Sequence, residues 1–206
     1  MDAKDAAEQL REAKENERFD NIAALIISVM AMLLAITSVG GSNAVEDMLT
    51  SQIEASDTWN FYQAKNIRQT MYRVFAEEID ERLKLGDGGI NVTQRQTLEK
   101  RLNDYRSTVT RYESEPDPQD PTNPIKGEGK KELTARARYL EGERDKARER
   151  DNNFDYAEAL FQIAIVLGSV SIVANKRPLL WLSAGMGLVA TLLMLNGFFL
   201  VVKLPF

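Results

Sequence analysis

Cysteine and histidine are both absent from the 206 residues of this chain. Without them the chain has no disulfide, no thiolate nucleophile, no cysteine–histidine zinc site and no histidine-ligated haem. Catalysis would have to rest on carboxylates, lysine or tyrosine, and no pair of these is set in a recognisable pocket. We therefore expect a protein that is not an enzyme, with no catalytic residue, no metal site and no cofactor.

A basic surface is lacking too, since the net charge is −5. Proteins that bind nucleic acid use clustered lysine and arginine, so we expect no nucleic-acid partner.

Charged side chains are missing from three stretches of the chain. The longest, residues 179–202, contains 24 consecutive uncharged residues and can cross a hydrocarbon layer of about 30 Å. Residues 22–39 and 159–174 are shorter uncharged stretches of the same kind. The predicted fold class is an all-α membrane protein with the lipid bilayer as a partner. It has three transmembrane helices and a long helical-hairpin or coiled-coil arm inserted between the first and second.

Proline is scarce, and four of the six prolines lie within residues 114–129, which predicts an extended, solvated linker. Gly40 and Gly41 are predicted to end or bend the first span, and the glycine-rich residues 86–89 to form a turn. Residues 1–41 would then form a charged N-terminal helix and the first span. Residues 42–156 would form the arm, with helices at about 43–85, 93–113 and 130–156, and residues 157–206 a transmembrane hairpin.

Three local signals refine these bounds. Asn43 with Glu46, and Thr93 with Gln96, have the spacing of capping boxes that start new helices. Asn91 begins an Asn-Val-Thr triplet that fits either a glycosylation sequon or a helix start. No helix breaker occurs between residues 130 and 174, so we predict one continuous helix of about 65 Å there.

Two groups in the arm are candidate contacts with an oligomer or partner. Residues 98–112 contain apolar side chains at steps of 4, 3, 4 and 3, a coiled-coil seam whose natural partner is the preceding helix. The other group is aromatic, and its members cannot all face one stripe of a helix. They pack either on the helix of residues 130–156 or on another protein, where tryptophan, tyrosine and arginine are favoured. The candidate contact residues are Trp59, Phe61, Tyr62, Arg68, Leu98, Leu102, Tyr105 and Val109.

The spans lack ionisable side chains, which argues against a proton-coupled carrier. Small residues spaced four apart allow helix backbones to approach closely in lipid. The pairs Ala164 with Gly168 and Ser183 with Gly187 are therefore predicted packing positions, either within one subunit or between subunits.

Orientation depends on the lysines and arginines near the span ends, and six lie on each face. Those on the side of the N-terminus are Lys4, Arg11, Lys14, Arg18, Lys176 and Arg177. Those on the other side are Arg138, Arg144, Lys146, Arg148, Arg150 and Lys203. Charges in short loops weigh most, so Lys176 and Arg177 predict a cytoplasmic N-terminus with the arm on the opposite side.

Residues 52–78, QIEASDTWNFYQAKNIRQTMYRVFAEE, follow a first span that ends in GGSNA, and LNGFF lies near the end of the chain. In these segments the chain resembles the bacterial membrane-protein family catalogued as domain of unknown function 4337. The resemblance covers most of the chain and implies a bacterial inner-membrane protein. With the N-terminus cytoplasmic, as the charges predict, the arm of this multi-pass protein would lie in the periplasm. That family has no assigned activity, so the resemblance transfers no catalytic residue.

The leading hypothesis is a homo-oligomeric protein that acts as a structural or interaction module through its arm. Its motivation is that one subunit's helices cannot easily bury both the aromatic group and the seam. Two alternatives remain open: a pore lined by serine and threonine and formed by the oligomer, and an accessory subunit of a larger membrane complex.

Overall fold

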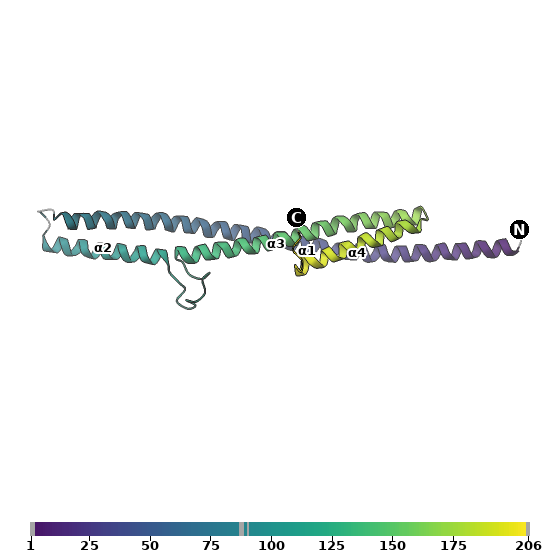
Figure 1. Cartoon of the computed structure of the whole chain (residues 1–206), viewed down its shortest axis with the longest axis horizontal. Coiled ribbons are helices and arrows are strands. Elements are labelled where there is room, and N and C mark those ends of the chain that lie inside the picture. Colours follow the sequence, from purple (N-terminus) through teal and green to yellow (C-terminus); the bar gives the residue numbers. More distant parts are fainter. Residues whose placement is uncertain (1–2, 87–88, 90, 205–206) are drawn as a thin grey trace. The chain divides into compact units, whose positions relative to one another are not determined.

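The computed structural model describes residues 3–86, 89 and 91–204, and in this part the chain forms four helices and no strand. They are α1 (Ala3–Leu85), α2 (Val92–Glu113), α3 (Lys130–Val173) and α4 (Arg177–Phe199). The helices make two compact units (Figure 1). The three-helix unit comprises Met1–Met48 and Asp145–Phe206, and the other unit is Leu49–Arg144. The predicted all-α class is confirmed, and so is the unbroken course of α3.

Helix α1 continues through Gly40 and Gly41 without interruption. Of the two effects predicted for these glycines, an end or a bend of the first span, an end of the helix is wrong. The new helix predicted from the capping box of Asn43 with Glu46 is wrong too. A glycine inside a helix costs only about 1 kcal/mol, which long flanking helical segments outweigh. Here the glycine makes room for an aromatic ring, because a Cβ atom on Gly40 would lie 2.8 Å from the ring of Phe154.

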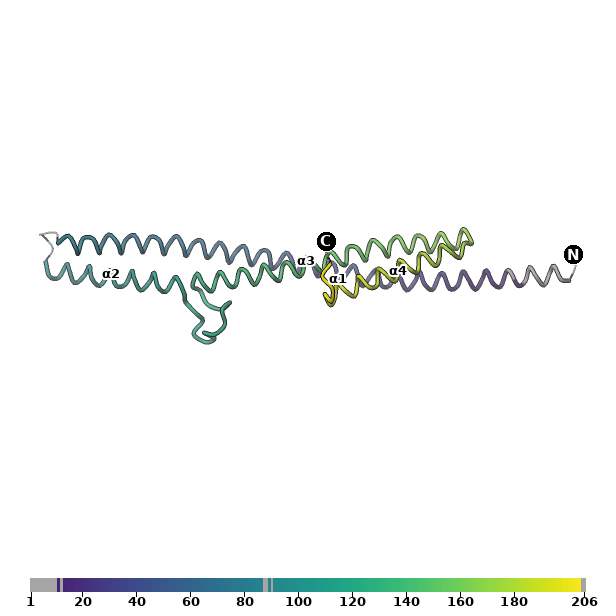
Figure 2. The backbone as a smooth tube through the Cα atoms, viewed as in Figure 1, coloured from purple at the N-terminus to yellow at the C-terminus, as the bar shows by residue number. Residues whose placement is uncertain are grey.

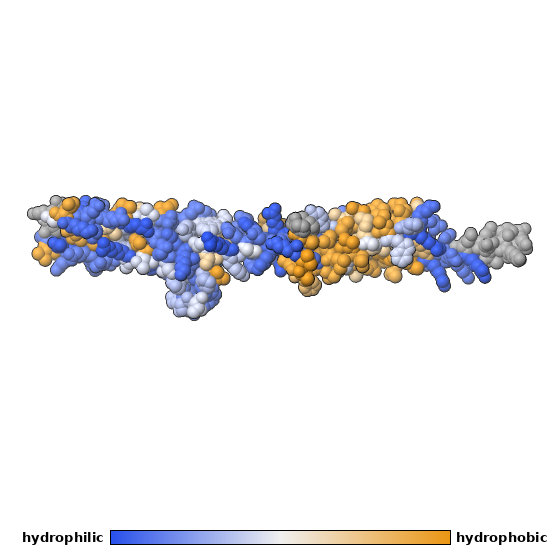
Figure 3. Space-filling view, in the orientation of Figure 1, coloured by the Kyte–Doolittle hydropathy of each residue, from blue (hydrophilic) through white to orange (hydrophobic). Residues whose placement is uncertain are grey.

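Phe154 belongs to the core of the three-helix unit, where it packs with Met30, Phe161, Ala190 and Met194. Its ring meets that of Phe198 edge to face, with centroids 4.9 Å apart. Helices α1, α3 and α4 each contain an 18-residue window long and apolar enough to cross a membrane. Hydrophobic residues accordingly cover the visible face of this unit over α4 and the later part of α3 (Figure 3).

In the Leu49–Arg144 unit, α2 and the first part of α3 lie one after the other beside α1 (Figure 1). The residues of α1 that face them follow steps of 3 and 4, which is the spacing of a coiled-coil seam. This inner face consists of Ala55, Thr58, Tyr62, Lys65, Gln69, Tyr72, Ala76 and Ile79, all buried or half-buried. Three of its buried members, Thr58, Lys65 and Gln69, are polar.

Of the two helix starts predicted for α2, the one at Asn91 is confirmed and the capping box of Thr93 with Gln96 is wrong. Asn91 is the N-cap, its side chain accepts the Gln94 amide, and the Gln94 side chain accepts the Asn91 amide in return. The cap is thus two residues earlier than the expected pair Thr93 and Gln96. In the predicted turn, Gly86 has a φ of 62°, which glycine adopts without strain. Residues 87, 88 and 90 lie outside the described part.

Residues 114–129 do not form an extended linker, and that prediction is wrong. The segment folds back on itself between α2 and α3 (Figure 2). Pro116 and Gly127 form an isolated antiparallel bridge, and the Glu128 amide donates to the Glu115 carbonyl at 3.0 Å. Prolines keep the segment from being helical, as expected, but contacts at its two ends close it into a loop.

Candidate functional site

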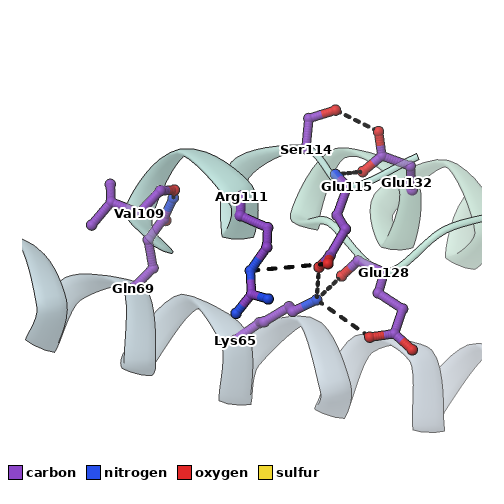
Figure 4. Close-up of polar contacts among 8 residues, drawn as sticks. All are labelled: Lys65, Gln69, Val109, Arg111, Ser114, Glu115, Glu128 and Glu132. Carbon is purple, nitrogen blue, oxygen red and sulfur yellow. Dashed lines mark hydrogen bonds and ion pairs between the residues drawn. The ribbon is translucent and has the colours of Figure 1, made fainter. Parts of the chain in front are cut away.

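Lys65 lies where the two ends of the 114–129 loop meet, and its side chain is only 7% exposed (Figure 4). Its ammonium group lies 3.2 Å from a carboxylate oxygen of Glu115 and also donates to the carbonyl of Glu128. The rings of Phe61 and Tyr112 lie 5.5 and 5.3 Å from the same nitrogen, in the range of cation–π attraction. One buried cation therefore joins both ends of the loop to α1.

Gln69 lies one turn further along α1 and joins α2 to α3. Its amide nitrogen donates to the Val109 carbonyl and to Glu113, each at 2.9 Å. Its amide oxygen accepts from Lys130 at 2.8 Å, and Lys130 also lies 3.2 Å from Glu113. Hydrogen bonds from Gln69 and Lys130 lower the pKa of Glu113. Gln69 thus ties the last two turns of α2 and the first turn of α3 to α1.

Glu132, in the first turn of α3, completes the closure and is only 5% exposed. Its carboxylate accepts from the Ser114 hydroxyl at 2.6 Å and from the Glu115 amide at 3.1 Å. Burial opposes its ionisation, but these hydrogen bonds prevail and the pKa of Glu132 is lowered. Gly129 lies against this carboxylate, and a Cβ there would collide with the main chain at Ser114.

The residues Lys65, Gln69, Glu113, Glu115, Lys130 and Glu132 form what we call the neck cluster. Buried polar groups at coiled-coil core positions fix the register of the helices, since a shifted register would leave them unpaired. The neck cluster therefore has a structural explanation. Sequence reasoning missed it, although polar residues at positions 65 and 69 of the inner face were a usable signal. Among the described residues, no group of three or more carboxylates is placed to hold a metal ion.

The aromatic candidate residues contact their own chain. Trp59 donates from its indole nitrogen to Glu141 of α3 at 2.9 Å, and its ring packs edge to face on Tyr62 at 5.5 Å. Tyr62 in turn lies under the ammonium group of Lys130. Phe61 and Arg68 remain exposed on the surface. Of the two interpretations of this group, the contact with the helix of residues 130–156 is the one seen here.

The predicted seam on α2 also faces α1 of the same chain. Leu102 is buried, Leu98, Tyr105 and Val109 are half-buried, and the Tyr105 ring lies 5.5 Å from that of Tyr72. One chain therefore accommodates the seam, whose partner is the preceding helix as predicted, and two of the three aromatic residues. Phe61 and Arg68 stay on the surface. These contacts give no support to the expectation that one subunit cannot easily bury both groups.

The small residues of the spans pack within one chain. The Ser183 hydroxyl donates to the Ala164 carbonyl at 2.6 Å, joining α4 to α3. A Cβ on Gly168 would lie 2.9 Å from Ile27, and one on Gly187 would lie 2.6 Å from Met30, both on α1. These four positions hold α1, α3 and α4 together.

The face of α1 opposite its inner face has no partner in the Leu49–Arg144 unit. Apolar residues are more than half exposed there: Ile53 60%, Ile67 62%, Met71 52% and Val74 54%. Between residues 49 and 74 this outer seam steps by 4 and 3 and contains no charge at any of its eight positions. They are Leu49, Ile53, Ser56, Asn60, Gln63, Ile67, Thr70 and Val74.

These observations define a class: an all-helical protein with three helices able to cross a membrane and a second unit built from the helical segments between them. The sequence profile of the family described as Domain of unknown function (DUF4337) matches residues 19–200. The chain belongs to this family, as the resemblance indicated, and the match extends over both units. No curated protein and no solved structure matches the chain.

Proposed function

We propose that this chain is a non-enzymatic membrane protein that assembles with copies of itself and acts as a structural or interaction module. In this proposal α1, α3 and α4 cross the bacterial inner membrane. The Leu49–Arg144 unit is a coiled-coil arm in the periplasm, and the N-terminus is cytoplasmic. The observation that carries the proposal is the outer seam of α1, an uncharged stripe on an otherwise highly charged unit.

The residue types of the outer seam favour a second copy of this chain as the partner. When Ile53 is placed at heptad position a, the other a positions are Asn60, Ile67 and Val74. β-Branched residues at a favour parallel two-stranded coiled coils, and a single asparagine at a fixes register and strand number. All copies insert in the membrane in the same sense, so two α1 helices meet with the same chain direction.

Flanking charges agree with a parallel pair. In that register Arg73 occupies position g and Glu78 the following position e, which meet across a parallel interface. The d positions are mostly polar, so the seam alone is weak. Anchoring in one membrane raises the effective concentration of one arm near another, which compensates for weak pairing.

The mass of the full chain in mild detergent, measured by light scattering after subtracting the detergent, tests this proposal. We expect twice the chain mass of 23.2 kDa. Ile67→Glu places a charge in the seam without touching the inner face and should give monomers. Val92→Glu, at a residue that is 75% exposed on α2, is the matched control and should stay dimeric. A monomeric native chain, or equal masses for the two variants, would contradict the proposal.

The pore alternative gains no support from the hydroxyls of the spans. Those of Ser28, Thr37, Ser169 and Thr191 each donate to a carbonyl of their own helix. The accessory-subunit alternative predicts co-purification of another protein from native membranes in fixed ratio, which self-assembly does not.

A further inference from the structure

A groove lies between the early turns of α1 and the first two turns of α4, with a volume of 490 Å³. Its floor is apolar, since Phe19 and Leu180 are each only 8% exposed and pack with fully buried Ala23. Its walls include Ile22, Ile26 and Ala184. A hydrocarbon chain would find continuous apolar surface along these residues.

One end of the groove is charged. Arg18 on α1 and Arg177 on α4 both line it, together with Glu15. The Arg177–Glu15 pair is long, at 3.4 Å, and its side chains are 63% and 70% exposed. Exposed pairs of this kind contribute little to stability, so a stronger anion can displace Glu15. Guanidinium groups bind phosphate in the two-point geometry that makes such contacts strong.

The surroundings of the groove match a membrane interface. Trp181 stands at its rim and is 79% exposed, as is typical of tryptophan at the headgroup level. Residues 11–20 and 175–177 together carry five basic and four acidic side chains, a net charge of +1. Hydrophilic side chains gather at the end of this unit beside the α3–α4 turn, next to the hydrophobic band (Figure 3).

We propose that this groove binds one anionic phospholipid, with an acyl chain along Ile22, Ile26 and Ala184 and the phosphate between Arg18 and Arg177. Basic pockets beside transmembrane helices select acidic headgroups for this reason, and each arginine near the surface adds about a fivefold preference. The site rests on the proposed membrane insertion of α1 and α4 but not on the outer seam, so a monomeric chain would leave it standing.

The fluorescence of Trp181, at the rim of the groove, reports which lipid lies there. The full chain is reconstituted with phosphatidylcholine and a small fraction of brominated phosphatidylglycerol or brominated phosphatidylcholine, and quenching of tryptophan fluorescence is compared. Trp59 belongs to the Leu49–Arg144 unit and gives a constant background. We expect the brominated phosphatidylglycerol to compete for the site about five- to twenty-five-fold better than the zwitterionic lipid.

The double variant Arg18→Gln/Arg177→Gln should reduce this preference to unity, whereas Arg11→Gln/Lys14→Gln removes the same charge outside the groove and should retain it. If the first double variant fails to fold, Ala184→Leu fills the apolar wall, leaves both guanidinium groups and should also weaken the preference. Equal quenching by the two lipids overturns the proposal. So does equal loss of preference in the two double variants, which indicates diffuse attraction. Competition by millimolar inorganic phosphate identifies a free-anion site and likewise overturns it.

Discussion

Lys65 is a single side chain on which the closure of a sixteen-residue segment depends, since it contacts both Glu115 and the Glu128 carbonyl. Lys65→Met keeps most of its volume and removes the charge. Water can reach Glu115, which is 34% exposed, so we expect a loss of about 1–2 kcal/mol in local stability rather than the full penalty of an unpaired buried charge. Amide exchange in residues 113–130 should accelerate roughly 5- to 30-fold.

The control for that variant is Lys84→Met, which breaks the Lys84–Asp80 pair in which the lysine is 73% exposed. Surface pairs contribute little, so exchange should change less than about threefold. Unchanged exchange in the Lys65 variant would show that the loop is held by other contacts.

Glu132 makes the closure dependent on pH. Its folded pKa is lowered below the ordinary value of 4.5, so its stabilising contribution is complete above 4.5 and is lost as the pH falls through the folded pKa. Glu132→Gln removes this titration, and its single carbonyl oxygen can accept from only one of the two donors, Ser114 or Glu115, without the strength of a charged acceptor. At pH 7 we expect the variant to be less stable than the native chain by about 1–3 kcal/mol in the free energy of unfolding. Thermal unfolding in detergent, followed by circular dichroism, measures this difference. The difference in stability between the native chain and the variant should shrink below pH 4.5. A difference that does not change with pH would show that the Glu132 carboxylate does not control the closure of the loop.

At the scale of helices, the glycines separate into packing positions and open positions. Gly40→Ala pushes a methyl group into the buried ring of Phe154 and should destabilise the chain by about 1–3 kcal/mol. Gly142→Ala, on α3, has nothing within 4 Å and should stabilise it by about 0.5–1 kcal/mol. Opposite shifts of the two melting temperatures are expected. Equal shifts would mean that Gly40 affects only helix propensity.

Gly40 also shows where sequence reasoning ends. The uncharged stretches and the heptad steps were sufficient to place helices along the chain, because they are local patterns, but they divided α1 into two helices at Gly40 and Gly41. The ring that requires Gly40 is Phe154, 114 residues away, and no local pattern reveals it. The loop was misjudged for the same reason: its prolines exclude a helix, but Lys65 and Glu132, which close it, lie outside it. The Asn91 cap was a local signal that could have been chosen over Thr93.

The predicted contact residues divide in the same way. Apolar periodicity identified the side chains on α2 that pack, and their predicted partner, the preceding helix, is confirmed. Tyr105 and Leu102 lie on the side of α2 that faces α1 of the same chain, and the outer seam stays uncovered in this unit. Which face of α1 remains uncovered depends on the position of α2 and α3, and only the folded chain shows it.

For the whole molecule, the central claim is that two copies pair in parallel along the outer seam, and the absence of cysteine makes this directly measurable. A single Ile67→Cys variant in native membranes places one thiol at a seam position that faces its own counterpart across a two-fold axis. Ser107→Cys, on α2 and away from the seam, is the control. Under mild oxidation we expect disulfide-linked dimers from Ile67→Cys and none from Ser107→Cys. Monomer in both variants, or dimer in both, would contradict the account.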